Sequence, residues 1–116
     1  MNAMRLAALV MGVSLFASRG LKAQAPDGQA IYREECRSCH GAAGKPTQRA
    51  VGQYKNMPTL DSTFLSTRSI DSIVTVLNHG KGKDMKSFKD KLSADEIAAV
   101  AKYVKQTFGG TAATSH

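Results

Sequence analysis

Apolar residues recur at helical spacing in three segments of the chain, and glycine-rich polar stretches separate these segments. The first segment begins near Asp27, a residue suited to cap a helix, and carries its inward-facing positions on one stripe. That stripe consists of Gly28, Ile31, Tyr32, Cys36 and Cys39. The spacing therefore predicts a helix whose two cysteines both face inward.

Two further helices are predicted in the C-terminal half. One spans residues 69–79, with isoleucine, valine and leucine at helical spacing, and ends at Gly80. The other opens with Ser93 and Glu96, which form a capping box, and continues to Gly109. No stretch alternates with period two for long enough to form a sheet, so the pattern predicts an all-α fold.

The connection between the first two helices, residues 41–66, scatters its apolar positions without a clear period. A structureless connection of this length is unusual in a compact domain unless it wraps around something. With 116 residues the chain can form one domain, and a domain of this size has little core to spare. We therefore expect the fold to depend on a cross-link or a bound group.

Residues 1–23 have the order of a secretory signal. Arg5 gives a basic start, an apolar run follows over residues 6–17, and small residues precede the expected cleavage point. The apolar run is shorter than the roughly 20 residues needed to span a bilayer. We therefore predict an exported, periplasmic protein with no stable membrane insertion after processing.

The domain boundaries follow from this leader. We place cleavage after Ala23, because Pro26 should hinder cleavage after Ala25. The folded domain then spans residues 24–108, and the small polar residues 109–116 form a C-terminal tail that we expect to be flexible.

The net charge does not alter these predictions. The chain carries +7, and because Arg5, Arg19 and Lys22 lie in the leader, the remaining domain carries +4. Nucleic-acid binding would need a denser basic patch with interleaved aromatic residues. We therefore predict no nucleic-acid partner.

Both cysteines of the chain lie within residues 36–40, which read Cys-Arg-Ser-Cys-His. On a helix, cysteines at i and i+3 point their sulfurs to the same side, about one turn apart. A redox dithiol would expect a preceding strand, which the pattern does not predict. A zinc site would need His79 and His116 as further ligands, and a structural disulfide is also open.

Covalent haem attachment accounts for all five positions of this motif. The thiols of Cys36 and Cys39 would each add to a vinyl group of one haem, which thereby becomes haem c, and His40 would turn its imidazole to the iron. The haem would also supply the apolar surface around which a small helical domain and a long connection can fold. We therefore favour haem attachment over the other three chemistries.

The sequence resembles the class I c-type cytochromes, which are small exported mono-haem electron carriers. The resemblance covers residues 27–108; residues 27–41 carry its highly specific motif, and residues 78–104 support it. It implies a three-helix cytochrome c fold wrapped around one haem, with the first and last helices crossing near it. At that crossing the family places a small residue against an aromatic one, and the residues that look equivalent here are Gly28, Tyr32 and Tyr103.

The residues alone leave several candidates for the second axial ligand of the iron. The candidates are Met57, Met85, His79, a lysine, or none. Chain length excludes neither methionine. The resemblance implies Met85, since residues 85–88 look like the family's ligand methionine with its downstream phenylalanine. Residues 56–60 instead resemble the loop whose proline carbonyl accepts a hydrogen bond from the ligand histidine. Lys86 stands where the family often has proline, which leaves the rigidity of the Met85 loop open.

Lysines are concentrated beside Met85. Between residues 81 and 91 we define a lysine collar, which consists of Lys81, Lys83, Lys86, Lys89 and Lys91. If Met85 ligates the iron, the collar surrounds the exposed haem edge and would steer redox protein partners that have an acidic docking surface. An ordinary solvated loop is the alternative.

These observations favour a soluble electron carrier with one haem c and with His40 and Met85 as axial ligands. It would pass single electrons between exported redox proteins, as a monomer or weak oligomer. The alternative is a haem c electron-accepting subunit of a dehydrogenase or oxidoreductase complex. We do not expect an enzyme acting alone, because the sequence has no distal histidine paired with an arginine and no second haem motif. A sensor would need a labile sixth ligand and an output domain.

Overall fold

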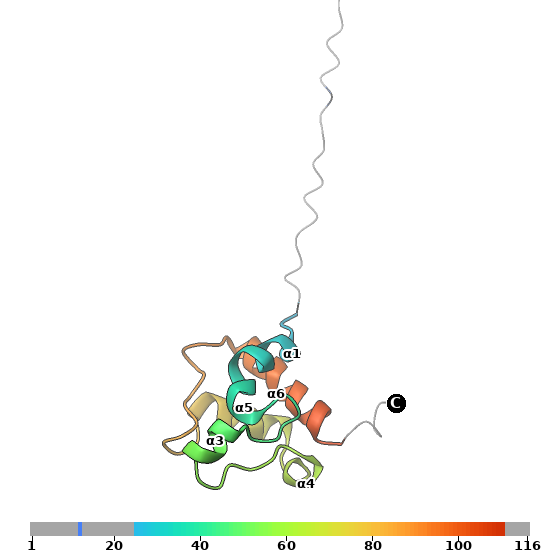
Figure 1. Ribbon diagram of the computed structural model, residues 1–116. Helices are drawn as coiled ribbons and strands as arrows, with labels where there is room; N and C mark the ends of the chain where they lie inside the picture. Colours follow the sequence, from blue (N-terminus) through green and yellow to red (C-terminus); the bar gives the residue numbers. More distant parts are fainter. Residues whose placement is uncertain (1–11, 13–24, 111–116) are drawn as a thin grey trace, which may run out of the picture.

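The computed structural model of the chain describes Gly12 and residues 25–110. Within this part the regular elements are helices, with one isolated β-bridge between Lys81 and Met85, which confirms the predicted all-α class (Figure 1). None of the described helices is both long and apolar enough to cross a membrane. Apart from Gly12, the predicted leader lies outside the described residues, as does the tail from Thr111 onward.

The first predicted helix is present as three consecutive pieces. These are α1 (Gly28–Ile31), the π-helical turn η1 (Tyr32–Cys36) and α2 (Arg37–His40). The Asp27 side chain caps α1 by accepting hydrogen bonds from the amides of Gln29 and Ala30, as predicted. The π-helical turn was not predicted, because a period of 3.6 residues does not reveal a local i→i+5 turn.

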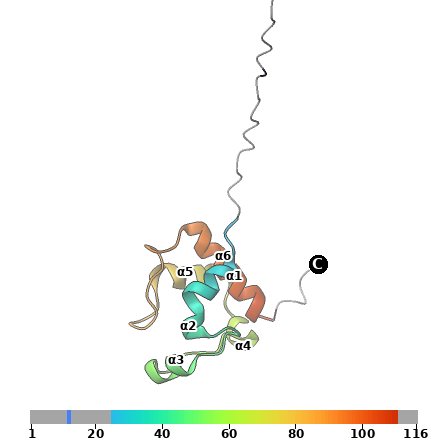
Figure 2. The same cartoon turned by 45° about the horizontal axis from the view of Figure 1, so that its top comes forward.

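The two C-terminal helices match their predictions closely. The helix α5 (Ile70–His79) is capped by Ser69 and ends before Gly80. The helix α6 (Ala94–Phe108) begins with the predicted capping box of Ser93 and Glu96. Both α1 and α5 contact α6 (Figures 1 and 2).

The long connection contains more structure than its sequence pattern indicated. It forms α3 (Gln48–Gln53) and α4 (Ser62–Leu65), which are capped by the side chains of Thr47 and Asp61. Figure 2 shows α3 beside α2, and these two helices are in contact. Both new helices are too short for apolar periodicity to reveal them.

The core lies where α1 and η1 cross α6. A Cβ atom built on Gly28 would lie 2.3 Å from the Ala99 carbonyl oxygen and 2.9 Å from Tyr103 Cβ, so the two backbones nearly touch there. The ring centroids of Tyr32 and Tyr103 are 5.5 Å apart. The crossing that the resemblance implied is therefore confirmed. The buried cluster around it consists of Ile31, Tyr32, Cys36, Leu65, Leu77, Leu92, Ile97, Val100, Ala101 and Val104.

Candidate functional site

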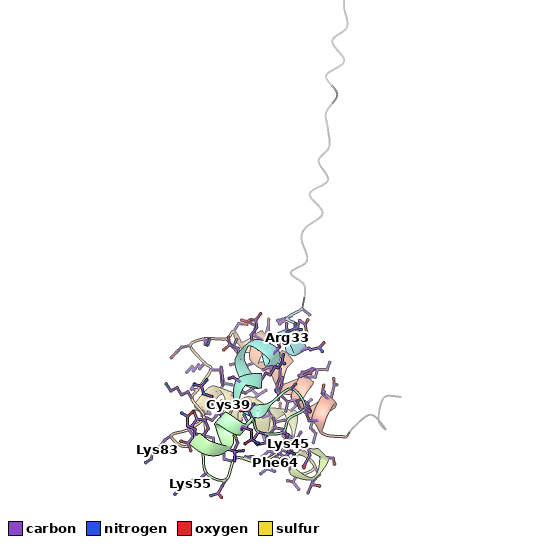
Figure 3. The ribbon with its side chains drawn as sticks, viewed as in Figure 1. Arg33, Cys39, Lys45, Lys55, Phe64 and Lys83 are labelled. Atoms are coloured by element: carbon purple, nitrogen blue, oxygen red, sulfur yellow. The ribbon has the colours of Figure 1, made fainter. Side chains whose placement is uncertain are left out.

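The two cysteines of the motif differ in their surroundings. Cys36 ends η1 and is buried, with 9% of its surface exposed, and burial together with the nearby Glu35 carboxylate raises the pKa of its thiol to about 12. Cys39 lies in α2 and is half-buried, near the point where α2 meets α3 (Figure 3). The inward orientation is thus confirmed for Cys36 and only in part for Cys39. Neither cysteine forms a disulfide.

His40 ends α2, directly after Cys39. Its Nδ1 atom is buried and has no hydrogen-bond partner among the residues that the structure places. The bond to the Pro58 carbonyl, which the resemblance implied, is therefore not formed. Burial lowers the pKa of His40, which keeps the imidazole in the neutral form that binds metals. Two thiols and a buried, unpaired imidazole nitrogen on one short segment fit covalent haem attachment.

Thr47 and Tyr32, which lie outside the motif, donate hydrogen bonds to backbone carbonyls in the motif or directly after it. Thr47 donates from Oγ1 to the Ser38 carbonyl at 2.9 Å and from its amide to the Cys39 carbonyl at 3.0 Å. The Tyr32 hydroxyl donates to the Gly41 carbonyl at 2.7 Å. Sequence reasoning did not assign these roles to Thr47 and Tyr32. The only signals were a glycine directly after the histidine and a threonine that could cap a helix.

The alternative chemistries find no support in the described part of the chain. No group of three or more histidine, cysteine, aspartate or glutamate side chains is placed to hold a metal there. The segment that precedes the motif is helical rather than a strand, unlike the context of a redox dithiol. His116, one of the two histidines that a zinc site would need, lies outside the described residues.

The loop that carries Met85 is anchored without a proline. The Lys81 amide donates to the Met85 carbonyl at 2.8 Å, and the Met85 amide donates to the Lys81 carbonyl at 3.3 Å. Further along, the Phe88 amide donates to the Leu77 carbonyl at 2.8 Å, which ties the loop to α5. These hydrogen bonds therefore support the loop, although Lys86 stands where the family often has proline.

Gly80 is the residue that permits this arrangement. Its φ of 74° and ψ of −179° lie in a region open almost only to glycine. A Cβ atom built there would lie 2.6 Å from the Met85 carbonyl oxygen and 2.8 Å from the Ser87 amide nitrogen. The end of α5 thus sets the position of the Met85 backbone.

The two candidate methionines occupy different surroundings. Met85 is partly buried and packs against the core cluster that includes Cys36. Met57 is partly buried too, but it does not belong to that cluster. It lines a shallow cleft together with Val51, Tyr54, Lys55 and Asn56. The structure therefore packs Met85, but not Met57, against the core cluster that includes Cys36.

Comparisons with known proteins agree on one family. The family model described as "Cytochrome C oxidase, cbb3-type, subunit III" matches residues 23–104. Cytochrome c6 of Microcystis aeruginosa is 37% identical over 78 residues, which are 67% of this chain and 90% of that protein. The cbb3-type cytochrome c oxidase subunit CcoP of Rhodobacter capsulatus is 32% identical over 95 residues, which are 75% of this chain but 30% of the subunit. The solved structure of the KustC0563 c-type cytochrome has a TM-score of 0.63 and 29% identity, and the match covers 71% of this chain and 98% of that one.

We predict that Gly80→Ala loosens the Met85 loop. The added Cβ atom meets the Met85 carbonyl and forces a backbone conformation that costs about 1–3 kcal/mol. The Lys81 amide, which donates to that carbonyl, should therefore exchange its hydrogen faster than in the parent protein. The measurement is amide hydrogen exchange followed by NMR.

The matched control is Gly82→Ala in the same loop. Gly82 also has a positive φ of 60°, but a Cβ atom there would meet nothing within 4 Å. It should show a smaller change at Lys81, because it carries the conformational cost without the clash. Equal exchange rates in the two variants would contradict the assigned role of Gly80.

Proposed function

The chain belongs to the class I c-type cytochromes, and we propose on this basis that it binds one haem c and carries single electrons between exported redox proteins. The observation that carries the proposal is the segment ending in His40, which presents two thiols and a buried, unpaired imidazole nitrogen. When bound, haem c supplies an iron that changes between the ferric and ferrous states.

In this proposal Cys36 and Cys39 hold the haem covalently. Each sulfur would form a bond to one carbon of a vinyl group, and the thiol hydrogen would go to the other carbon, so no further reactant would be consumed. The raised pKa of Cys36 means that its thiol stays protonated at neutral pH until it reacts. The neutral imidazole of His40 is in the form that can ligate the iron.

Met85 completes the proposed ligand set. Its thioether sulfur favours ferrous iron and so raises the reduction potential. Its place beside the core cluster and its anchored loop support this choice over Met57. If His40 and Met85 both ligate the iron, no position would be left on it for a substrate, which favours a carrier over an enzyme.

One residue of the lysine collar, Lys91, differs from the other four because it forms an ion pair. Lys91 lies 2.7 Å from the Glu35 carboxylate, so its charge is partly compensated within the protein. The remaining collar residues are exposed, and they are Lys81, Lys83, Lys86 and Lys89. Figure 3 shows Lys83 at the outer edge of the molecule. We assign to these four lysines the steering of a redox partner with an acidic docking surface.

The proposed location is the periplasm. It rests on the order of residues 1–23, which is that of a cleavable secretory signal, and on the expected domain over residues 24–108. We further propose that the processed protein is a monomer or weak oligomer. Sedimentation of the purified protein, with N-terminal sequencing of its mature form, tests both statements.

A second candidate function is an electron-accepting subunit of a larger oxidoreductase. It is favoured by the similarity to the cbb3-type oxidase subunit and by the description of the matching family model. Purification from native membranes and extracts distinguishes the two functions. Recovery as a free protein supports the carrier, whereas stable co-purification with a larger enzyme supports the subunit.

We predict that the purified protein carries one covalent haem. Its mass should exceed that of the polypeptide by one haem, and acidified organic solvent should not extract the group. A double variant, Cys36→Ala with Cys39→Ala, should lose the haem under that treatment and be largely unfolded without it. Ser38→Ala, between the two cysteines, should retain the covalent haem. A parent protein whose mass shows no covalent haem would overturn the proposal.

A second prediction concerns the sixth ligand. Met85→Ala should lower the reduction potential and abolish the weak long-wavelength absorption band of sulfur-ligated ferric haem, because the thioether is gone. The variant should also bind carbon monoxide, which the parent should not. Redox titration and absorption spectroscopy provide both measurements.

Met57→Ala is the matched control for this prediction. It should keep the band and the parent potential, because we assign Met57 to packing. If Met57→Ala removes the band while Met85→Ala keeps it, the ligand assignment is wrong. A parent that binds carbon monoxide readily and lacks the band would contradict the carrier itself.

A third prediction tests the collar. Electron transfer to an acidic blue-copper protein should slow as salt rises, because the Debye length falls from about 30 Å at 0.01 M to about 8 Å at 0.15 M. Lys83→Glu should slow the reaction at low salt by roughly tenfold or more. Lys102→Glu on α6 makes the same charge change outside the collar and should slow it less. Rates that do not vary with ionic strength would show that the collar does not steer the partner and is an ordinary solvated loop.

A further inference from the structure

A buried hydrogen bond links the residues on either side of the proposed haem-binding motif. The Tyr32 hydroxyl, on η1, donates to the carbonyl of Gly41, which directly follows His40, and the two oxygens are 2.7 Å apart. Tyr32 is 3% exposed, so this bond is shielded from water. Of the two residues that it joins, one lies before Cys36 and the other directly after His40. The bond therefore connects the two ends of the segment that contains the motif.

The hydroxyl is not needed for packing. The Tyr32 ring already contacts Tyr103 and Phe108, with centroid distances of 5.5 Å and 5.2 Å. A phenylalanine ring would fill the same space. Burial raises the pKa of Tyr32, so the hydroxyl remains a donor across the physiological pH range. The contribution of the Tyr32 hydroxyl is therefore its hydrogen bond to the Gly41 carbonyl.

His40 depends on its backbone for orientation. Its Nδ1 atom has no hydrogen-bond partner in the described part of the chain, so no bond at that atom fixes the ring. On one side, Thr47 holds the Cys39 carbonyl at 3.0 Å. On the other side, the chain leaves through Gly41, whose φ of 74° and ψ of 163° are open almost only to glycine.

We propose that Tyr32 is a positioning residue for His40, and that its hydroxyl fixes the backbone from which the proposed iron ligand projects by holding the Gly41 carbonyl. This inference rests on the proposed function, because it takes His40 to be an axial ligand. It concerns the hydroxyl alone and not the aromatic packing at the crossing of the helices.

Two consequences follow from losing the hydroxyl. The Gly41 peptide gains freedom, so the plane of the His40 ring can turn. The Gly41 carbonyl oxygen also loses its shorter hydrogen bond and keeps only the Gly44 amide, 3.4 Å away, as a donor. Its negative end beside the proposed ligand is then less compensated, which favours the more positive ferric iron. The reduction potential should therefore fall.

The test compares Tyr32→Phe with Tyr103→Phe in the haem-loaded protein. Both variants remove one hydroxyl from the same aromatic cluster, but no hydrogen bond of the Tyr103 hydroxyl is found among the described residues. In Tyr32→Phe, the paramagnetically shifted NMR signals of the His40 ring should move and the reduction potential should be lower than in the parent. In Tyr103→Phe both should stay at the parent values.

Three outcomes decide the inference. If Tyr32→Phe loses stability but keeps the His40 signals and the potential of the parent, the hydroxyl is merely structural and the inference is wrong. It is also wrong if both variants shift the signals equally. If the parent itself shows no covalent haem or no shifted His40 signals, the proposed function fails first, and that failure is visible without either variant.

Discussion

The close approach of α1 and α6 at Gly28 is the constraint on which the rest of the structure depends. A Cβ atom there would lie 2.3 Å from the Ala99 carbonyl oxygen, so any larger residue would push the helices apart. Because the helices nearly touch, Tyr32 reaches Tyr103 and Phe108 at the start of η1. The same crossing carries Cys36, at the end of η1, into the core.

The other half of the site is supported from α5. Gly80 lets the chain reverse directly after that helix, and the Met85 loop is bonded to itself and to α5. The ion pair between Glu35 and Lys91 joins η1 to the segment that precedes α6. Lys91 is 64% exposed, so this pair contributes at most about 1 kcal/mol, and the backbone bonds matter more. Both segments that carry candidate ligands therefore rest on the same core.

The sequence predicted those features that local chemistry controls. The cap at Asp27, the helix over residues 69–79 and the capping box at Ser93 could all be recognised, since each depends on neighbouring residues. The π-helical turn over Tyr32–Cys36 could not be recognised, because an apolar period of 3.6 residues does not reveal a local i→i+5 turn. Thr47 was missed for a similar reason: its bonds to the motif appear only when α3 folds back onto α2.

The anchoring of the two segments that carry the proposed ligands bears on the choice between a carrier and a sensor. A carrier exchanges electrons fastest when its ligands keep their positions in both oxidation states, whereas a sensor needs one ligand that detaches easily. Backbone carbonyls on both sides of His40 accept hydrogen bonds, and Met85 is held through both its amide and its carbonyl. A ligand held in this way resists detachment, because moving it would break bonds that the loop cannot replace elsewhere. The hydrogen bonds of the backbone, more than the identity of the ligands, thus favour electron transfer as the function of this domain.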